Sequence, residues 1–175
     1  MRIIGIVLVI LLVSCKHDAS QQEQQDLEVS KDVAALPTLE VYDYEGLKPF
    51  LKTTSDSTYI INFWATWCAP CIKELPYFEA INKNYKDRNV SVTLVSLDFP
   101  KKYESHLKPY IRDNEIKSRV VVLNDSDSNT WIPAIDPDWS GAIPATLIYN
   151  KNKRAFYEQP FTYEELETEL QKFLN

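Results

Sequence analysis

Hydrophobic positions change their spacing along the chain, and each change predicts a new structural element. Residues 58–65 (TYIINFWA) and 90–99 (VSVTLVSLDF) are continuous apolar runs rich in β-branched and aromatic residues. Such runs are typical of strands that are buried on both faces. Four further segments are shorter strand candidates: residues 38–44, 119–123, 145–150 and 154–160. The polar tripeptide at 151–153 separates the last two candidates and predicts a hairpin turn.

Apolar residues also recur every three to four positions in several segments, which predicts helices. The main helical segments are residues 69–87, 101–115 and 163–174. Thr162 and Glu165 form a capping-box pattern before the last of these. Shorter features are a turn at Gly46, a short helix at 47–52, and a brief helix started by Asp127 within residues 125–139.

The resulting order of main elements is β-α-β-α-β-(short α)-β-β-α. Strands that alternate with helices and end in a hairpin followed by a helix predict an α/β fold, with a central mixed β-sheet and helices on both faces. A thioredoxin-like domain has this plan, but a fold does not by itself establish a function.

The first residues carry a different signal. Arg2 precedes an unbroken apolar run at 3–13, which is too short for the roughly 20 residues that span a bilayer and predicts a signal peptide over 1–14. The sequence LVSC, ending at Cys15, resembles the lipobox of bacterial lipoproteins, in which cleavage before the cysteine is followed by its acylation. The alternative is an ordinary signal peptide with an incidental cysteine.

Amino-acid composition predicts the domain organisation after the signal peptide and argues against some classes of function. Residues 15–35 consist of Cys15 and a stretch rich in Gln, Ser and charged residues, which predicts a flexible stalk before a single domain at 36–175. The chain has 25 acidic against 19 basic residues and no basic run, so nucleic acid is not expected as a partner. Beyond the signal peptide the only glycines are Gly46 and Gly141, which excludes a glycine-rich phosphate-binding loop.

The chemistry-bearing motif is the pair Cys68 and Cys71. Two cysteines this close cannot staple distant parts of a fold, and they are too few to close a zinc site. Cys68 is expected to open a helix directly after a buried strand, with Pro70 in the first turn. The positive end of the helix favours a thiolate at Cys68, whereas Cys71 lies one turn further in and is expected to keep its proton until it reacts.

Two segments resemble the thioredoxin superfamily. FWATWCAPC followed by Pro76 is similar to its active-site helix, and SGAIPATLIYN is similar to its cis-proline loop. The signal, the stalk and the CIKELP segment resemble the bacterial TlpA-like thiol-disulfide oxidoreductases, whose membrane-attached members reduce exported proteins. The resemblance covers residues 36–175.

This resemblance implies a role for each matching position. Cys68 would be the attacking thiolate and Cys71 the resolving thiol, without a cofactor or metal. Glu74 matches the carboxylate behind the active site of TlpA-like proteins. Asn62 stands where many thioredoxins carry a buried aspartate, which leaves Glu74 as the main candidate for proton relay. The residues expected to contact the substrate are Trp67, Ala69, Pro70, Ile143 and Pro144.

Simpler interpretations of these residues remain open at this point. Glu74 could be an ordinary surface carboxylate, Trp67 merely an exposed aromatic residue, and Pro144 a trans proline that ends a loop. His17 and His106 are expected to be solvated or half-buried histidines without a chemical role.

The expected function is reduction of disulfides in exported proteins such as cytochrome c apoprotein, by a monomer that is lipid-anchored in the bacterial cell envelope, facing the periplasm or the outer surface. A membrane thiol-disulfide transporter would supply the electrons. A thiol peroxidase on the same fold would need Thr and Pro where the chain has Ala65 and Ile61. A copper metallochaperone would need one more residue between the cysteines and a distant histidine ligand, for which His106 is the only candidate in the domain.

Overall fold

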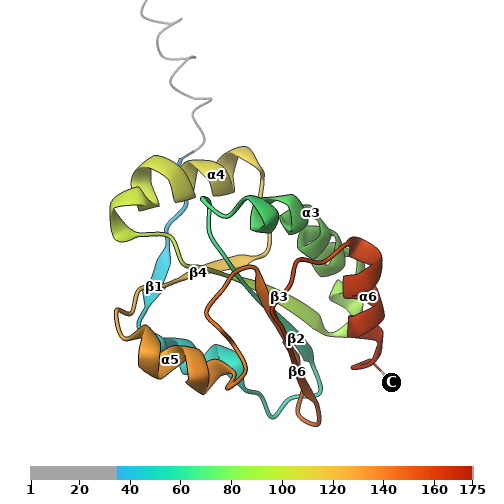
Figure 1. The fold of residues 1–175 in the computed structure, drawn as a ribbon. Helices are drawn as coiled ribbons and strands as arrows, with labels where there is room; N and C mark the ends of the chain where they lie inside the picture. Colours follow the sequence, from blue (N-terminus) through green and yellow to red (C-terminus); the bar gives the residue numbers. More distant parts are fainter. Residues whose placement is uncertain (1–34, 175) are drawn as a thin grey trace, which may run out of the picture. The chain divides into compact units, whose positions relative to one another are not determined.

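A computed structural model describes residues 35–174, which contain a six-stranded mixed sheet (Figure 1). The strands in sheet order are β1 (Glu40–Tyr42), β4 (Arg119–Leu123), β3 (Val90–Ser96), β2 (Thr58–Trp64), β5 (Ala145–Tyr149) and β6 (Arg154–Tyr157). The first three pairings are parallel, and the β2–β5 and β5–β6 pairings are antiparallel. The expected signal peptide, Cys15 and the stalk up to residue 34 lie outside the described residues.

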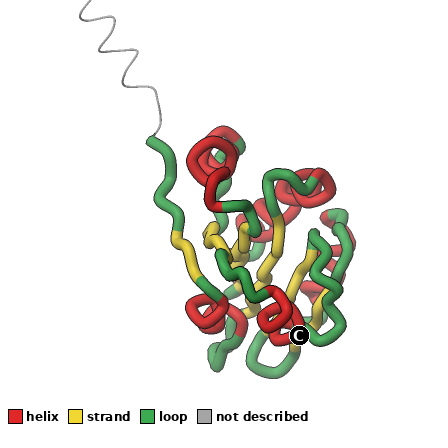
Figure 2. Tube along the Cα trace, turned by 60° about the vertical axis from the view of Figure 1, so that its left-hand side comes forward, coloured by secondary structure: helices red, strands yellow, loops and turns green. Residues whose placement is uncertain are grey.

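Helices cover both faces of this sheet, as Figures 1 and 2 show. One face packs against α3 (Ala69–Asn84), α4 (Lys108–Asp113) and α6 (Tyr163–Gln171), and the other against α2 (Tyr44–Leu47) and α5 (Ser128–Ile135). Residues along β2 alternate between the two cores, as the pleat of a strand requires. Ile60 and Trp64 pack on the α3 side, and Ile61 and Phe63 pack on the α5 side. The predicted fold class is therefore confirmed.

Local capping patterns that are visible in the sequence are present in the structure. Asp127 is the N-cap residue of α5, and Thr162 with Glu165 forms a complete capping box at α6. The β5–β6 turn is closed by the side chain of Asn150, which accepts hydrogen bonds from the backbone N–H groups of Asn152 and Lys153, both at 2.8 Å. Among residues 35–174, none of the helices has the length and apolar character needed to span a bilayer.

Two sequence predictions near the ends of strands are wrong: the turn at Gly46 and the end of strand β3. Gly46 does not form a turn but lies within α2, because the side chain of Asp43 caps this helix and accepts the Gly46 N–H at 2.8 Å. Strand β3 ends at Ser96 instead of continuing to Phe99. The backbone N–H of Asp98 donates to Ser96 Oγ at 3.1 Å rather than to a neighbouring strand, so the chain has already left the sheet.

The helix predicted over residues 101–115 is interrupted. It consists of a 3-10 turn η3 (Pro100–Lys102), a π-helical turn η4 (Tyr103–Leu107) and the short helix α4. The Lys108 N–H donates to the Tyr103 carbonyl, five residues back, and the next residue, Pro109, has no N–H to continue an α-helical ladder. The apolar spacing persists through this segment, but the proline breaks the regular geometry. The segment predicted as helix 69–87 also ends earlier, with α3 followed by a 3-10 turn η2 (Lys86–Arg88).

Candidate active site

The cysteine pair lies at the first turn of helix α3. Strand β2 delivers the chain to this point, and Cys68 is the N-cap residue of the helix with an extended backbone. Cys68 and Cys71 form a disulfide, and the backbone N–H of Cys71 donates to Cys68 Sγ at 3.3 Å. Cys68 retains 5% of its surface exposed, whereas Cys71 is fully buried. Only Cys68 is thus placed to meet an incoming sulfur atom.

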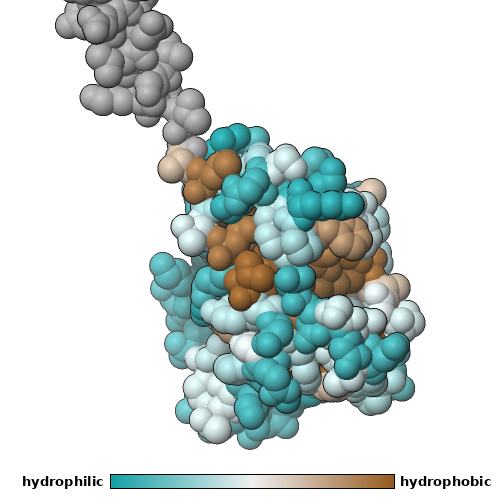
Figure 3. Space-filling view, turned by 90° about the vertical axis from the view of Figure 1, so that its left-hand side faces the viewer, coloured by the Kyte–Doolittle hydropathy of each residue, from teal (hydrophilic) through white to brown (hydrophobic). Residues whose placement is uncertain are grey.

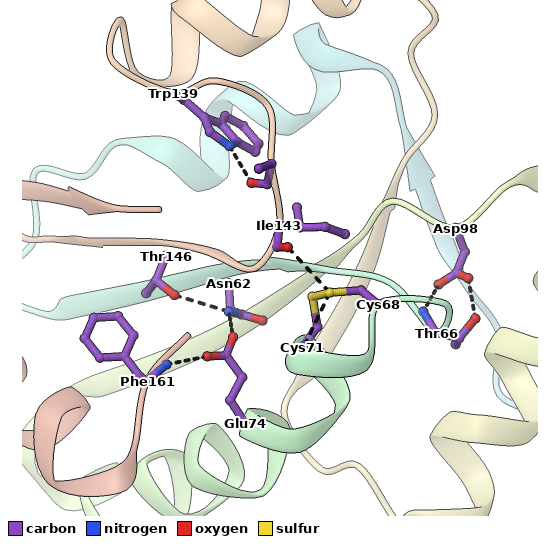
Figure 4. Close-up of a disulfide and its surroundings, with 11 residues drawn as sticks. Asn62, Thr66, Cys68, Cys71, Glu74, Asp98, Trp139, Ile143, Thr146 and Phe161 are labelled. Carbon is purple, nitrogen blue, oxygen red and sulfur yellow. Dashed lines mark hydrogen bonds between the residues drawn. A yellow bond between two sulfur atoms is a disulfide. The ribbon is translucent and has the colours of Figure 1, made fainter. Parts of the chain in front are cut away.

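The loop before β5 lies against the outer sulfur. The carbonyl oxygen of Ile143 is 3.7 Å from Cys68 Sγ, and the Ile143–Pro144 peptide bond is cis, as the resemblance implies (Figure 4). Hydrogen bonds hold this loop: Trp139 Nε1 donates to the Ala142 carbonyl at 2.8 Å, and the backbone N–H groups of Ser140 and Ala142 donate to the Glu158 carboxylate at 3.0 and 3.1 Å. The loop therefore presents a fixed backbone acceptor beside the cysteine pair.

Glu74 is not a surface carboxylate. Its side chain is 1% exposed and lies one turn beyond Cys71, with its carboxylate pointing toward Asn62 and the backbone of Phe161 (Figure 4). Asn62 Nδ2 donates to Oε1 at 2.9 Å, and the Phe161 N–H donates to Oε2 at 2.7 Å. Burial raises the pKa of Glu74 to about 7, although these two hydrogen bonds oppose the increase. This carboxyl group can therefore take up and release a proton near neutral pH.

Asn62 connects Glu74 to the sheet. It lies in the middle of β2, is fully buried, and also donates to Thr146 Oγ1 of β5 at 3.2 Å. Its carbonyl oxygen Oδ1 has no hydrogen-bond partner among the described residues. The side chain that replaces the aspartate of many thioredoxins is thus neutral and only partly satisfied.

Asp98 is a buried residue of the site that sequence reasoning missed. Its carboxylate accepts from the Thr66 N–H at 3.0 Å, from Thr66 Oγ1 at 2.5 Å and from Ser96 Oγ at 2.9 Å. These contacts fix the loop between β2 and Cys68 to the end of β3 (Figure 4). The available signal was a carboxylate placed directly after a buried strand, where the ends of parallel strands meet.

The exposed side of the pair is apolar. Trp67, directly before Cys68, is 56% exposed, and its ring stacks on that of Phe99, which is 57% exposed, with 6.2 Å between ring centroids. Ala69 and Pro70 are exposed as well, whereas Ile143 is half-buried and Pro144 is buried. Figure 3 shows that apolar residues also gather on the face that carries β1. Phe99 was not foreseen as a partner of Trp67.

Within residues 35–174 no group of three or more His, Cys, Asp or Glu side chains is arranged to hold a metal ion. His106 is exposed, and its Nδ1 lies 2.8 Å from Ser105 Oγ of the neighbouring residue.

Known proteins are similar to this chain in fold and, more distantly, in sequence. The structure is similar to a thiol:disulfide interchange protein of the thioredoxin family from Chlorobium tepidum TLS (TM-score 0.58, 18% identity, 81% of this chain and 99% of that chain). It is also similar to StoA from Bacillus subtilis (TM-score 0.51, 20% identity, 70% of this chain and 85% of that chain).

At the sequence level, the chain is 28% identical to the thiol-disulfide oxidoreductase ResA of a Bacillus cereus strain, over 94% of this chain and 93% of that protein. A model of the AhpC/TSA family matches residues 32–155, a stretch that includes both cysteines, Glu74 and the cis-proline. The chain therefore belongs to the AhpC/TSA family, within which its relatives include TlpA-like thiol-disulfide oxidoreductases of the ResA type.

Proposed function

We propose that the protein is a thiol-disulfide oxidoreductase that reduces disulfides of exported proteins through Cys68 and Cys71. The observation that carries this proposal is the disulfide at the start of α3, with one sulfur at the surface and the other enclosed. Trp67, Ala69 and Pro70 adjoin Cys68 in the chain, and the Ile143 carbonyl lies 3.7 Å from its Sγ, so these residues together with Pro144 would receive the substrate chain.

Thiol chemistry determines the order of the steps. The Cys68 thiolate attacks one sulfur of a substrate disulfide, a mixed disulfide forms, and the other substrate sulfur leaves as a thiolate. Cys71 then loses its proton and attacks Cys68 Sγ, which closes the Cys68–Cys71 disulfide and releases the second substrate thiolate. Two electrons pass from the cysteine pair to the substrate. The two substrate thiolates are then protonated, one by the proton that Cys71 gave up and one by solvent, which had received the Cys68 proton when that thiol ionised.

Glu74 is the group proposed to receive the proton of Cys71. It lies one helical turn from Cys71, is shielded from solvent, and has a pKa of about 7 because of its burial. A base with this pKa is well matched to a proton transfer at neutral pH. Ala65 and Ile61, both buried, supply neither the hydroxyl nor the proline that a peroxidase site would use.

The cellular setting follows from the expected N-terminal signal. We infer that the mature protein is a monomer, anchored through a lipid on Cys15 in the bacterial cell envelope, and re-reduced by a membrane thiol-disulfide transporter. Relatives whose names describe secreted proteins, such as the secreted thiol-disulfide isomerase from Corynebacterium glutamicum, support an extracytoplasmic location.

Insulin reduction tests the enzymatic proposal. The purified domain, kept reduced by dithiothreitol, should accelerate the precipitation of insulin chains, and Cys68→Ser should abolish the acceleration. Once dithiothreitol has been removed, reduced Cys71→Ser should instead accumulate a mixed disulfide with insulin, because no resolving thiol is present. Equal activity of wild type and Cys68→Ser would refute the catalytic assignment.

Labelling in cells tests the location. Wild-type protein should fractionate with membranes and incorporate labelled palmitate, and Cys15→Ala should lose the label. A soluble and unlabelled wild-type protein would overturn the lipoprotein assignment without affecting the proposed chemistry.

A further inference from the structure

The side-chain amide of Asn62 holds an unusual position beside Glu74. It extends from β2 into the space between the sheet and α3, where it is fully buried. One end of the amide is used twice: Nδ2 donates to Glu74 Oε1 at 2.9 Å and to Thr146 Oγ1 at 3.2 Å. The other end, Oδ1, has no partner among the described residues.

An unpaired buried acceptor destabilises the folded state, so its presence at the centre of a site calls for a physical reason. The two ends of an amide have nearly the same shape, and a half-turn of the group exchanges a donor for an acceptor at the same place. The ionised carboxylate of Glu74 needs a donor at this place, whereas the protonated acid, if Oε1 carries the proton, needs an acceptor. One amide can serve both states.

We propose that Asn62 positions Glu74 in both of its protonation states, donating an N–H to the carboxylate and turning its amide to accept the O–H of the carboxylic acid. The proposal rests on the proposed function, because it concerns the proton that Cys71 gives up. In the protonated state the Thr146 hydroxyl can rotate and donate to the same Asn62 oxygen. The Phe161 N–H donates to Oε2 in both states, so α3 need not move.

A neighbour that positions Glu74 in both states must be able to donate a hydrogen bond to its carboxylate and to accept one from its acid form. From the sheet, β2 and β5 supply only the neutral Asn62 and Thr146. From α3 itself come Cys71, one turn earlier, and the titratable side chains of Lys73 and Tyr77, which line a surface depression that reaches Glu74.

The remaining neighbour is the segment that begins α6. It contributes the Phe161 N–H and the carboxylate of Glu165, which lines the same depression. Glu165 is held in the capping box, where it accepts the Thr162 N–H at 2.9 Å. Of the groups hydrogen-bonded to the Glu74 carboxylate, the Phe161 N–H can only donate. Asn62 alone can present either a donor or an acceptor.

A pH titration of matched variants tests the proposal. Asn62→Leu keeps the size of the side chain but removes both donor and acceptor, and Thr146→Val removes only the second partner of the amide. The midpoint of Glu74 ionisation, followed by carboxyl carbon NMR, should rise by about one pH unit in Asn62→Leu and by much less in Thr146→Val. It rises because the lost hydrogen bond to the charged carboxylate is stronger than the lost hydrogen bond to the neutral acid. Release of a model peptide from its mixed disulfide with Cys68 should slow about 3- to 10-fold at pH 7.

Two controls separate positioning from a structural effect. In a Glu74→Gln background, Asn62→Leu should produce no further change in the pH profile of release. In wild type, the side-chain amide signals of Asn62 should titrate with the midpoint of Glu74, a measurement that requires no substitution and no activity. An unchanged Glu74 midpoint in Asn62→Leu, or amide signals that stay constant through the titration, would overturn the proposal. Failure of wild type to exchange any disulfide would instead refute the proposed function.

Discussion

Two carboxylates, Glu74 and Asp98, are buried on opposite sides of the cysteine pair, and they differ in the number of hydrogen bonds that they accept. Asp98 accepts three hydrogen bonds, one from a backbone N–H and two from hydroxyl groups. Glu74 accepts two and lies against an amide that is itself incompletely paired. Both side chains are almost fully removed from solvent, with 1% of Glu74 and 3% of Asp98 exposed.

The difference shows that burial alone does not define a proton relay. A carboxylate that joins two segments through several donors acts as a fixed structural link, and Asp98 connects the Thr66 loop to β3 in this way. A carboxylate with fewer donors, whose burial raises its pKa to about 7, can change its protonation state during a reaction. Three predictions test this contrast, and a fourth tests the apolar side of the same site; they follow in order of decreasing effect.

Removal of the Asp98 carboxylate should have the largest effect. Asp98→Ala leaves the part-buried backbone N–H of Thr66 and the hydroxyl groups of Thr66 and Ser96 without this acceptor, and we expect it to lower the free energy of unfolding by about 3–4 kcal/mol. Urea denaturation monitored by circular dichroism measures this change. Asp138→Ala, at an exposed position, is the matched control and should remain close to wild type. A loss no larger than that of the control would show that Asp98 does not hold the loop.

Glu74 should make stability fall as pH rises. The folded pKa of about 7 lies above the ordinary value of 4.5, so the folded state binds more protons between these values. The contribution of the neutral, buried acid to the free energy of unfolding is fully present below pH 4.5, and it is lost as pH rises through about 7. Glu74→Gln should remove this dependence and be more stable by about 2–3 kcal/mol at pH 8. The free energy of unfolding of both proteins is measured by urea denaturation at several pH values. If it depends on pH in the same way for both proteins between pH 4 and 8, the pKa of Glu74 is not raised.

Glu74→Gln should also slow the chemistry that the wild-type carboxylate assists. Loss of a general base beside Cys71 is expected to reduce the rate of release from the mixed disulfide about 10-fold or more, while formation of the mixed disulfide by Cys68 changes less. Rapid-quench measurement of both steps with one peptide disulfide distinguishes them. If both steps slow equally, Glu74 acts on the site as a whole rather than on Cys71.

Phe99 should have the smallest effect, confined to the apolar side of the site. Phe99→Ala removes the ring that stacks on Trp67, and we expect KM for a peptide disulfide flanked by aromatic residues to increase about 3- to 10-fold. The rate with a small aliphatic disulfide should remain unchanged, as should both rates in Val41→Ala, another exposed apolar position. If the activity with both substrates falls equally, Phe99 affects the reaction of the cysteines rather than the binding of the substrate.

Much of the fold could be predicted because its determinants are local. The two apolar runs that form β2 and β3, the turn around Asn150 and the capping box at Thr162 are each specified by a few neighbouring residues. The interruption of the 101–115 helix was missed because the apolar spacing persists through Pro109 while the backbone hydrogen bonds do not.

The partners within the site depend on contacts between distant segments. Cys68 and Cys71 could be found from their spacing at the start of a helix, and Glu74 from the resemblance to TlpA-like proteins. The contact of Glu74 with the Phe161 N–H joins residues 87 positions apart, and that of Thr66 with Asp98 joins residues 32 apart. No periodicity or motif in the chain encodes such pairs, so the burial and hydrogen bonding of both carboxylates required the tertiary structure.

The position of Cys68 Sγ as the cap of α3 has a consequence for the driving force of the reaction. An interaction that stabilises the reduced thiolate more than the disulfide raises the reduction potential, by about 30 mV for each 1.4 kcal/mol in a two-electron couple. The Cys71 N–H at 3.3 Å acts in this direction, and an ionised Glu74 acts against it. The balance between a helix end and one buried acid therefore tunes the reduction potential of this pair, and the difference from the partner's potential decides in which direction electrons flow.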